Sequence, residues 1–71
     1  MDIRAYMLPG CGACERQAGM MDLSDINVVT DRSEMSGISG TPTIDVSCGD
    51  GTRHRFVGVT EESDIREVCG K

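Results

Sequence analysis

The sequence predicts a small α/β domain in which a four-stranded mixed sheet packs against two main helices. Four short segments alternate apolar and polar residues or are rich in β-branched residues, as strands are, and two others show the periodicity of amphipathic helices. The first strand, helix and second strand follow so closely that a right-handed parallel crossover is expected. The chain has 71 residues, enough for one small core. We therefore expect residues 1–71 to form a single domain.

The first strand and the first helix are predicted on either side of a short loop. Residues 2–8 alternate in a way typical of a half-buried strand, and Pro9-Gly10 ends it. From about Ala13 onward, three apolar residues recur at the i, i+4 and i+7 positions of a helix: Cys14, Ala18 and Met21. Cys11 is therefore expected at or just before the start of this helix.

Cys11 is predicted to be a reactive nucleophile. The first turn of a helix has unpaired backbone N–H groups and a partial positive charge, and both favour a thiolate over a thiol. Cys14 lies one turn inside the helix, where its sulfur can reach that of Cys11. The pair can then hold a disulfide or exchange it with a substrate through a mixed disulfide. Pairs of this kind have thiol pKa values lowered to between about 3.5 and 7.

The middle of the chain predicts a second strand and little helix. Residues 26–30 have the composition of a strand. Residues 31–39 are too few, and too rich in Ser and Gly, for more than one or two helical turns. One face of the sheet is therefore expected to be thinly covered.

The last part predicts a hairpin and a helix. Residues 43–48 and 52–58 form the two strands around Gly49-Asp50-Gly51, with Val46 opposite His54 and Asp45 opposite Arg55. The final helix is expected to begin at Thr60 as its N-cap. Its apolar stripe is formed by Ile65, Val68 and Cys69.

Two motifs resemble those of the thioredoxin and glutaredoxin superfamily. Pro9-Gly10-Cys11-Gly12-Ala13-Cys14 follows one strand, and Gly40-Thr41-Pro42-Thr43-Ile44 opens a later one. The resemblance spans nearly the whole chain. It implies a minimal thioredoxin fold with sheet order 2-1-3-4 and a short or vestigial middle helix. It also implies that Pro42 is cis and faces the dithiol.

The resemblance implies a small dithiol–disulfide oxidoreductase that reduces protein disulfides. Cys11 attacks the substrate and Cys14 resolves the mixed disulfide, with no bound cofactor and no metal. Substrate contacts are implied for Gly12, Ala13, Thr41, Pro42, Gly58 and Val59. Glutathione or an NADPH-dependent reductase is the implied electron source, and ribonucleotide reductase is a substrate that such small redoxins often serve. Gly58-Val59 has one glycine where glutaredoxins have two, and Gly10 stands where thioredoxins have tryptophan, so the electron donor stays open.

The alternatives are a non-catalytic binding module and a metal or iron–sulfur carrier. A structural zinc site needs two close couples of ligands, whereas Cys48, His54 and Cys69 are scattered. His54 lies in mid-strand, so a role as general base is not expected. Topology brings Cys48 and Cys69 to the end of the sheet opposite Cys11, on its apolar face. They are either buried free thiols or a second, structural disulfide.

Composition and net charge exclude some classes of binding partner. Seven basic and twelve acidic residues give a net charge of −5, which argues against nucleic acid or an anionic membrane. No stretch approaches the ~20 apolar residues of a membrane span, and Met1-Asp2-Ile3-Arg4 does not resemble a signal peptide. We expect a cytoplasmic monomer.

Overall fold

The computed structural model describes residues 1–70, which fold into a sheet and short helices. The elements in chain order are β1 (Asp2–Tyr6), α1 (Gly12–Met20), β2 (Asn27–Val29), the 3₁₀ turn η1 (Arg32–Glu34), β3 (Thr43–Ser47), β4 (Arg53–Val57), α2 (Glu62–Glu67) and the 3₁₀ turn η2 (Val68–Gly70). Within these residues, no helix has the length and the apolar run that crossing a bilayer requires.

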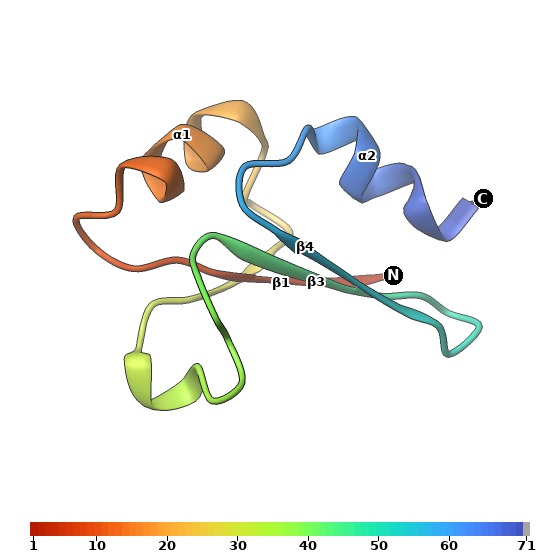
Figure 1. Ribbon diagram of the computed structural model, residues 1–71. Helices are drawn as coiled ribbons and strands as arrows, with labels where there is room; N and C mark the ends of the chain where they lie inside the picture. The colour runs from red at the N-terminus through yellow and green to blue at the C-terminus, as the bar shows by residue number, and fades with distance from the viewer. Residues whose placement is uncertain (71) are drawn as a thin grey trace.

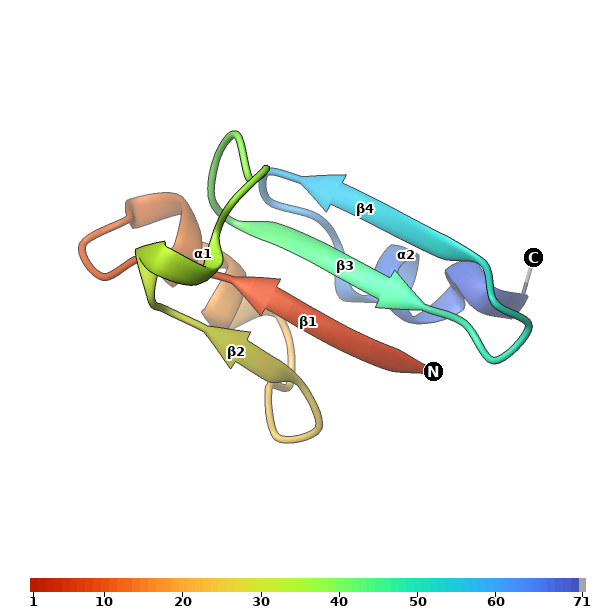
Figure 2. The same cartoon turned by 90° about the horizontal axis from the view of Figure 1, so that it is seen from below.

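The sheet has the order β2-β1-β3-β4 and confirms the predicted fold class. β1 runs parallel to β2 and antiparallel to β3, and β3 pairs antiparallel with β4. Helices α1 and α2 cover one face of the sheet, while only η1 lies against the other (Figure 1). Figure 2 shows that other face with β1, β3 and β4 uncovered. The topology is thioredoxin-like, with the middle helix reduced to the single turn η1.

The β3–β4 hairpin has the predicted register. Val46 pairs with His54 and Asp45 with Arg55, and the Cys48 N–H donates to the Thr52 carbonyl at 2.8 Å across the loop. The Arg55 guanidinium forms an ion pair with Asp45 at 2.7 Å on the uncovered face. A shift of β4 by one residue would turn Phe56 away from the core and set Arg55 opposite Val46, which explains why the register is fixed.

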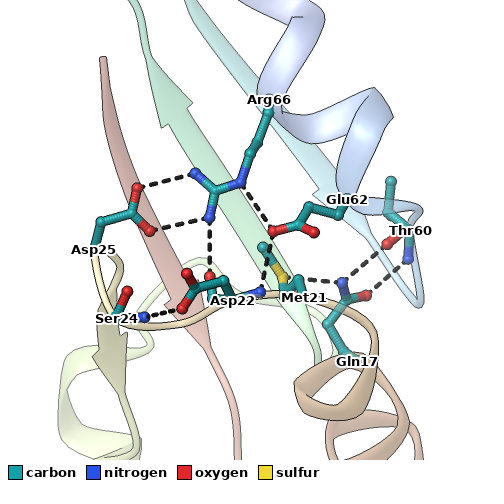
Figure 3. Close-up of polar contacts among 8 residues, drawn as sticks. All are labelled: Gln17, Met21, Asp22, Ser24, Asp25, Thr60, Glu62 and Arg66. Atoms are coloured by element: carbon teal, nitrogen blue, oxygen red, sulfur yellow. Dashed lines mark hydrogen bonds and ion pairs between the residues drawn. The ribbon is translucent and has the colours of Figure 1, made fainter.

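The inner face of α1 differs from the prediction. Ala18 is exposed, whereas Gln17 is completely buried. The Gln17 amide donates to the Thr60 carbonyl at 2.9 Å and accepts from the Thr60 N–H at 2.8 Å (Figure 3). It also donates to Met21 Sδ at 3.2 Å. Because these polar atoms are paired, the burial does not carry the penalty of an unsatisfied amide. The helix is therefore fixed to the segment between β4 and α2.

The prediction that Thr60 is the N-cap of α2 is wrong. Glu61 is the N-cap, and its side chain forms no capping hydrogen bond. The Thr60 backbone pairs with Gln17, and its hydroxyl donates to the Gly58 carbonyl at 3.1 Å. Instead of a cap, Arg66 anchors α2. Its guanidinium bonds Asp25 through two hydrogen bonds of 2.9 and 3.0 Å and bonds Glu62 at 2.9 Å (Figure 3).

Cys48 and Cys69 form a disulfide, which decides between the two possibilities that the sequence left open. Their Cα atoms are 5.5 Å apart, and the bond joins the residue after β3 to η2 across 21 positions of sequence. Ile65 of α2 is fully buried in the same core, and Val68 and Cys69 pack against it. The predicted apolar stripe of the last helix is thus confirmed, and the disulfide ties its end to the sheet.

Candidate dithiol site

Cys11 and Cys14 lie where the chain leaves β1 and enters α1. Gly10 has a φ of +77°, a conformation that glycine adopts without steric cost, and it turns the chain toward the helix. Cys11 is the N-cap of α1, and its Sγ accepts a hydrogen bond from the Cys14 N–H at 3.2 Å. The outer sulfur therefore satisfies one of the free N–H groups of the first helical turn.

The two thiols differ in exposure and in acidity. Both are free, with Cys11 half-buried and Cys14 only 4% exposed. Hydrogen bonds from the Cys14 thiol, the Thr41 hydroxyl and the Cys14 N–H lower the pKa of Cys11. Burial, followed by the hydrogen bond to Cys11, raises the pKa of Cys14. A single negative charge on the pair is thus favoured at the outer sulfur, which solvent can reach.

Thr41 and Pro42 form a wall beside the outer sulfur. The Thr41–Pro42 peptide bond is cis, as the resemblance implied. The Thr41 hydroxyl lies 3.5 Å from Cys11 Sγ, and the Thr41 carbonyl lies 3.8 Å from the same sulfur. Pro42 is buried, and its carbonyl accepts a hydrogen bond from the Gly58 N–H at 2.8 Å. The segment after β4 is therefore fixed next to this wall.

The remaining residues expected from the resemblance border this arrangement. Gly58 has a φ of +91°, and a Cβ placed on it would meet no other atom within 4 Å. Val59 is 38% exposed beside it. Gly12, which is exposed, and Ala13, which is half-buried, form the first turn of α1 between the two cysteines. His54 lies apart from this group, because it pairs with Val46 in the middle of β4.

A pocket beside Thr41 was missed by the sequence analysis. It has a volume of about 250 Å³, and its lining includes Leu8, Arg32, Met35 and Ile38 in addition to Thr41. The signal in the sequence is weak, namely two apolar residues three positions apart within a segment rich in Ser and Gly. Their spacing fits the short turn η1 and the loop that follows it.

A larger hollow lies elsewhere, on the uncovered face of the sheet. Its volume is about 620 Å³, and its lining includes Arg4, Asp45, Arg53 and Arg55. It does not include either free cysteine, so we assign no part of the dithiol chemistry to it. Within residues 1–70, no three His, Cys, Asp or Glu side chains gather in a group that could hold a metal ion.

Comparison of the chain with protein-family models, with curated proteins and with solved structures found no match. The dithiol is therefore interpreted from its own geometry and from the motifs that surround it.

Thr41→Val is expected to move the reactivity of Cys11 to higher pH. Valine keeps the branched shape but removes the hydroxyl that stabilises the thiolate, so the pKa of Cys11 rises. As the pH falls, the variant should lose its thiolate before the wild-type protein does. The measurement is the rate of iodoacetamide alkylation of the reduced protein between roughly pH 4 and pH 9. Thr52→Val, an exposed hairpin control, should keep the wild-type profile, and an unchanged profile in Thr41→Val would contradict the assigned role.

Proposed function

We propose that the protein is a small dithiol–disulfide oxidoreductase of the thioredoxin and glutaredoxin type, which reduces disulfides in other proteins. The main support is the asymmetry of the Cys11–Cys14 pair. The outer thiol has a lowered pKa at a helix start, and the inner thiol is buried with a raised pKa. An exchange reaction needs a nucleophile that solvent can reach and a second thiol held in reserve.

The first half of the reaction uses Cys11. Its thiolate attacks one sulfur of the substrate disulfide, so that a bond forms between Cys11 and that sulfur while the substrate S–S bond breaks. The departing substrate sulfur leaves as a thiolate and takes a proton from solvent. The protein and its substrate are then joined by a mixed disulfide.

The second half uses Cys14. Burial is the first cause that raises the pKa of Cys14, and the hydrogen bond to Cys11 and the negative charge of Cys11 raise it further. Once Cys11 is in the mixed disulfide, that charge is gone, and Cys14 loses its proton more easily. Cys14 then attacks the Cys11 sulfur and expels the second substrate thiolate. The substrate has gained two electrons and two protons, and the protein is left with a Cys11–Cys14 disulfide.

The residues around the dithiol suggest how an extended substrate is received. We assign one wall of the groove to Thr41 and Pro42, and its continuation next to Pro42 to Gly58 and Val59. Gly58 leaves open space for a substrate backbone. Gly12 and Ala13 keep the turn between the cysteines short, and Gly12 is exposed. No bound cofactor is needed for these steps.

Each turnover leaves the protein with a Cys11–Cys14 disulfide, and its reduction back to the dithiol requires a source of electrons. We propose glutathione or an NADPH-dependent reductase, acting on a cytoplasmic monomer that serves protein substrates such as ribonucleotide reductase. Offering the oxidised protein separately to glutathione and to thioredoxin reductase with NADPH, and then counting thiols, distinguishes the two donors.

Reduction of insulin disulfides in the presence of dithiothreitol tests the proposed activity. The wild-type protein should accelerate the reaction, and Cys11→Ser should return it to the rate without protein, with an unchanged circular dichroism spectrum. A wild-type rate equal to that of dithiothreitol alone would leave a non-catalytic binding module as the better interpretation. Visible absorbance and metal content of anaerobically purified protein would instead indicate a cluster or metal carrier.

A further inference from the structure

We propose that the pocket beside Thr41 binds an apolar side chain of the substrate polypeptide while Arg32 binds an acidic side chain next to it. This inference rests on the proposed function, and it adds a preference among substrates. It applies to a polypeptide that carries the disulfide close to an apolar and an acidic residue.

The pocket and the reactive sulfur share two residues. Thr41 lines the pocket, and its hydroxyl lies 3.5 Å from Cys11 Sγ. Leu8 also lines it, and the Leu8 carbonyl accepts a hydrogen bond from the Cys11 N–H at 3.3 Å. An extended chain advances about 3.3 to 3.6 Å per residue. A residue one or two positions from the attacked cysteine is therefore at the right distance to place its side chain in the pocket.

The lining of the pocket favours an apolar group. The apolar part of the lining comes from three half-buried residues, Leu8, Met35 and Ile38. The volume of about 250 Å³ is suited to one side chain rather than to a folded surface. Methionine is flexible and polarisable, so Met35 can adapt to apolar groups of different shape.

Arg32 gives the pocket a charge preference, because it is the only charged residue of the lining. Within residues 1–70 the ion pairs involve Arg55 and Arg66, and Arg32 forms none. The neighbouring Asp31 carboxylate accepts a hydrogen bond from the Ser33 N–H at 2.9 Å and caps η1. The exposed Arg32 guanidinium is therefore available for a carboxylate, which it can bind through two parallel hydrogen bonds.

The negative net charge of the protein means that Arg32 selects for an acidic residue at one position of the substrate. A net charge of −5 repels acidic polypeptides in general. An acidic residue is accepted only where a local cation offsets this repulsion, and Arg32 provides that cation next to the dithiol. A basic residue at the same position of the substrate would face Arg32 and be disfavoured.

The test uses short peptides whose single cysteine is joined to a chromophoric thiol, so that reduction releases colour. One peptide carries leucine and glutamate beside the cysteine, a second carries leucine and lysine, and a third carries two alanines. Each peptide is made twice, once with the two residues before the cysteine and once with them after it. In one of these two arrangements, the kcat/KM of the leucine–glutamate peptide should exceed that of each other peptide by about tenfold. Arg32→Glu should abolish the preference for glutamate over lysine, and Ile38→Ser should weaken the preference for leucine over alanine.

Two controls separate the possible failures. Arg53→Glu makes the same charge reversal on the uncovered sheet face and should keep the wild-type preferences. Bis(2-hydroxyethyl) disulfide is neutral and has no side chain, so Arg53→Glu should reduce it at the wild-type rate. The peptide rates of each variant are expressed relative to its own rate with this disulfide. If the wild-type protein does not reduce this small disulfide, the proposed function fails. If it does, and the peptides react equally or lose their differences alike in Arg32→Glu and Arg53→Glu, the pocket assignment is overturned.

Discussion

Cys14→Ser is expected to stop the reaction midway and to accumulate substrate as a mixed disulfide on Cys11. The outer sulfur keeps its place as N-cap and the hydrogen bonds from Thr41 and from the backbone of residue 14. It should therefore still attack. The resolving sulfur is missing, so release depends on an external thiol, and turnover should fall on the order of a hundredfold because the intramolecular attack is lost. Intact-protein mass spectrometry after mixing with a disulfide-containing protein measures the covalent complex, and a reductant should cleave it.

The same substitution at the other cysteine, Cys11→Ser, is the matched control for this trapping experiment. Cys11→Ser leaves Cys14 as the free thiol, but that thiol is 4% exposed and its pKa is raised by burial. It should form little or no mixed disulfide under the same conditions. Equal trapping by both variants would mean that the two cysteines are interchangeable, and the assignment of attacking and resolving roles would be wrong.

Much of the fold follows from local patterns in the sequence. The three-residue loop at Gly49–Gly51 and the opposite charges of Asp45 and Arg55 together fix the β3–β4 register. The composition of residues 31–39 limits helix there to one or two turns, and the structure has the single turn η1. Strand ends are shorter than predicted, since alternation continues past the last paired residue: β1 ends at Tyr6, although the Met7 N–H still bonds the Val29 carbonyl at 2.9 Å.

Features that depend on distant partners could not be predicted in this way. Gln17 is buried in place of Ala18 because its amide matches the backbone of Thr60, which is 43 positions away in sequence. The same pairing explains why Thr60 does not cap α2. At the dithiol, the motifs located Cys11, Cys14 and Thr41. The pocket of Arg32, Met35 and Ile38 depends on how a short irregular segment folds back beside Leu8, and the three-residue spacing of Met35 and Ile38 is too weak a signal to predict it.

Removing the Cys48–Cys69 disulfide is expected to lower the free energy of unfolding by about 3 kcal/mol, because a closed loop of this length restricts the unfolded chain by that amount. A domain of this size has a total stability of roughly 4 to 10 kcal/mol, so the loss is a large share of it. The disulfide also ties η2 to the end of β3, next to the buried Ile65 of α2. The last helix should therefore loosen first.

Denaturant unfolding of two double variants under non-reducing conditions distinguishes the structural disulfide from the exchanging dithiol. Cys48→Ala with Cys69→Ala should unfold at a clearly lower denaturant concentration than the wild-type protein in its dithiol form. Cys11→Ala with Cys14→Ala removes the same number of sulfurs, but no bond is lost, because both thiols are free in the structure. Its midpoint should shift by less, since the variant loses the capping hydrogen bond of Cys11 and the packing of the buried Cys14 but no covalent constraint. Equal shifts would mean that the second disulfide adds no constraint beyond the loss of its side chains, and that the core around Ile65 holds the last helix by itself.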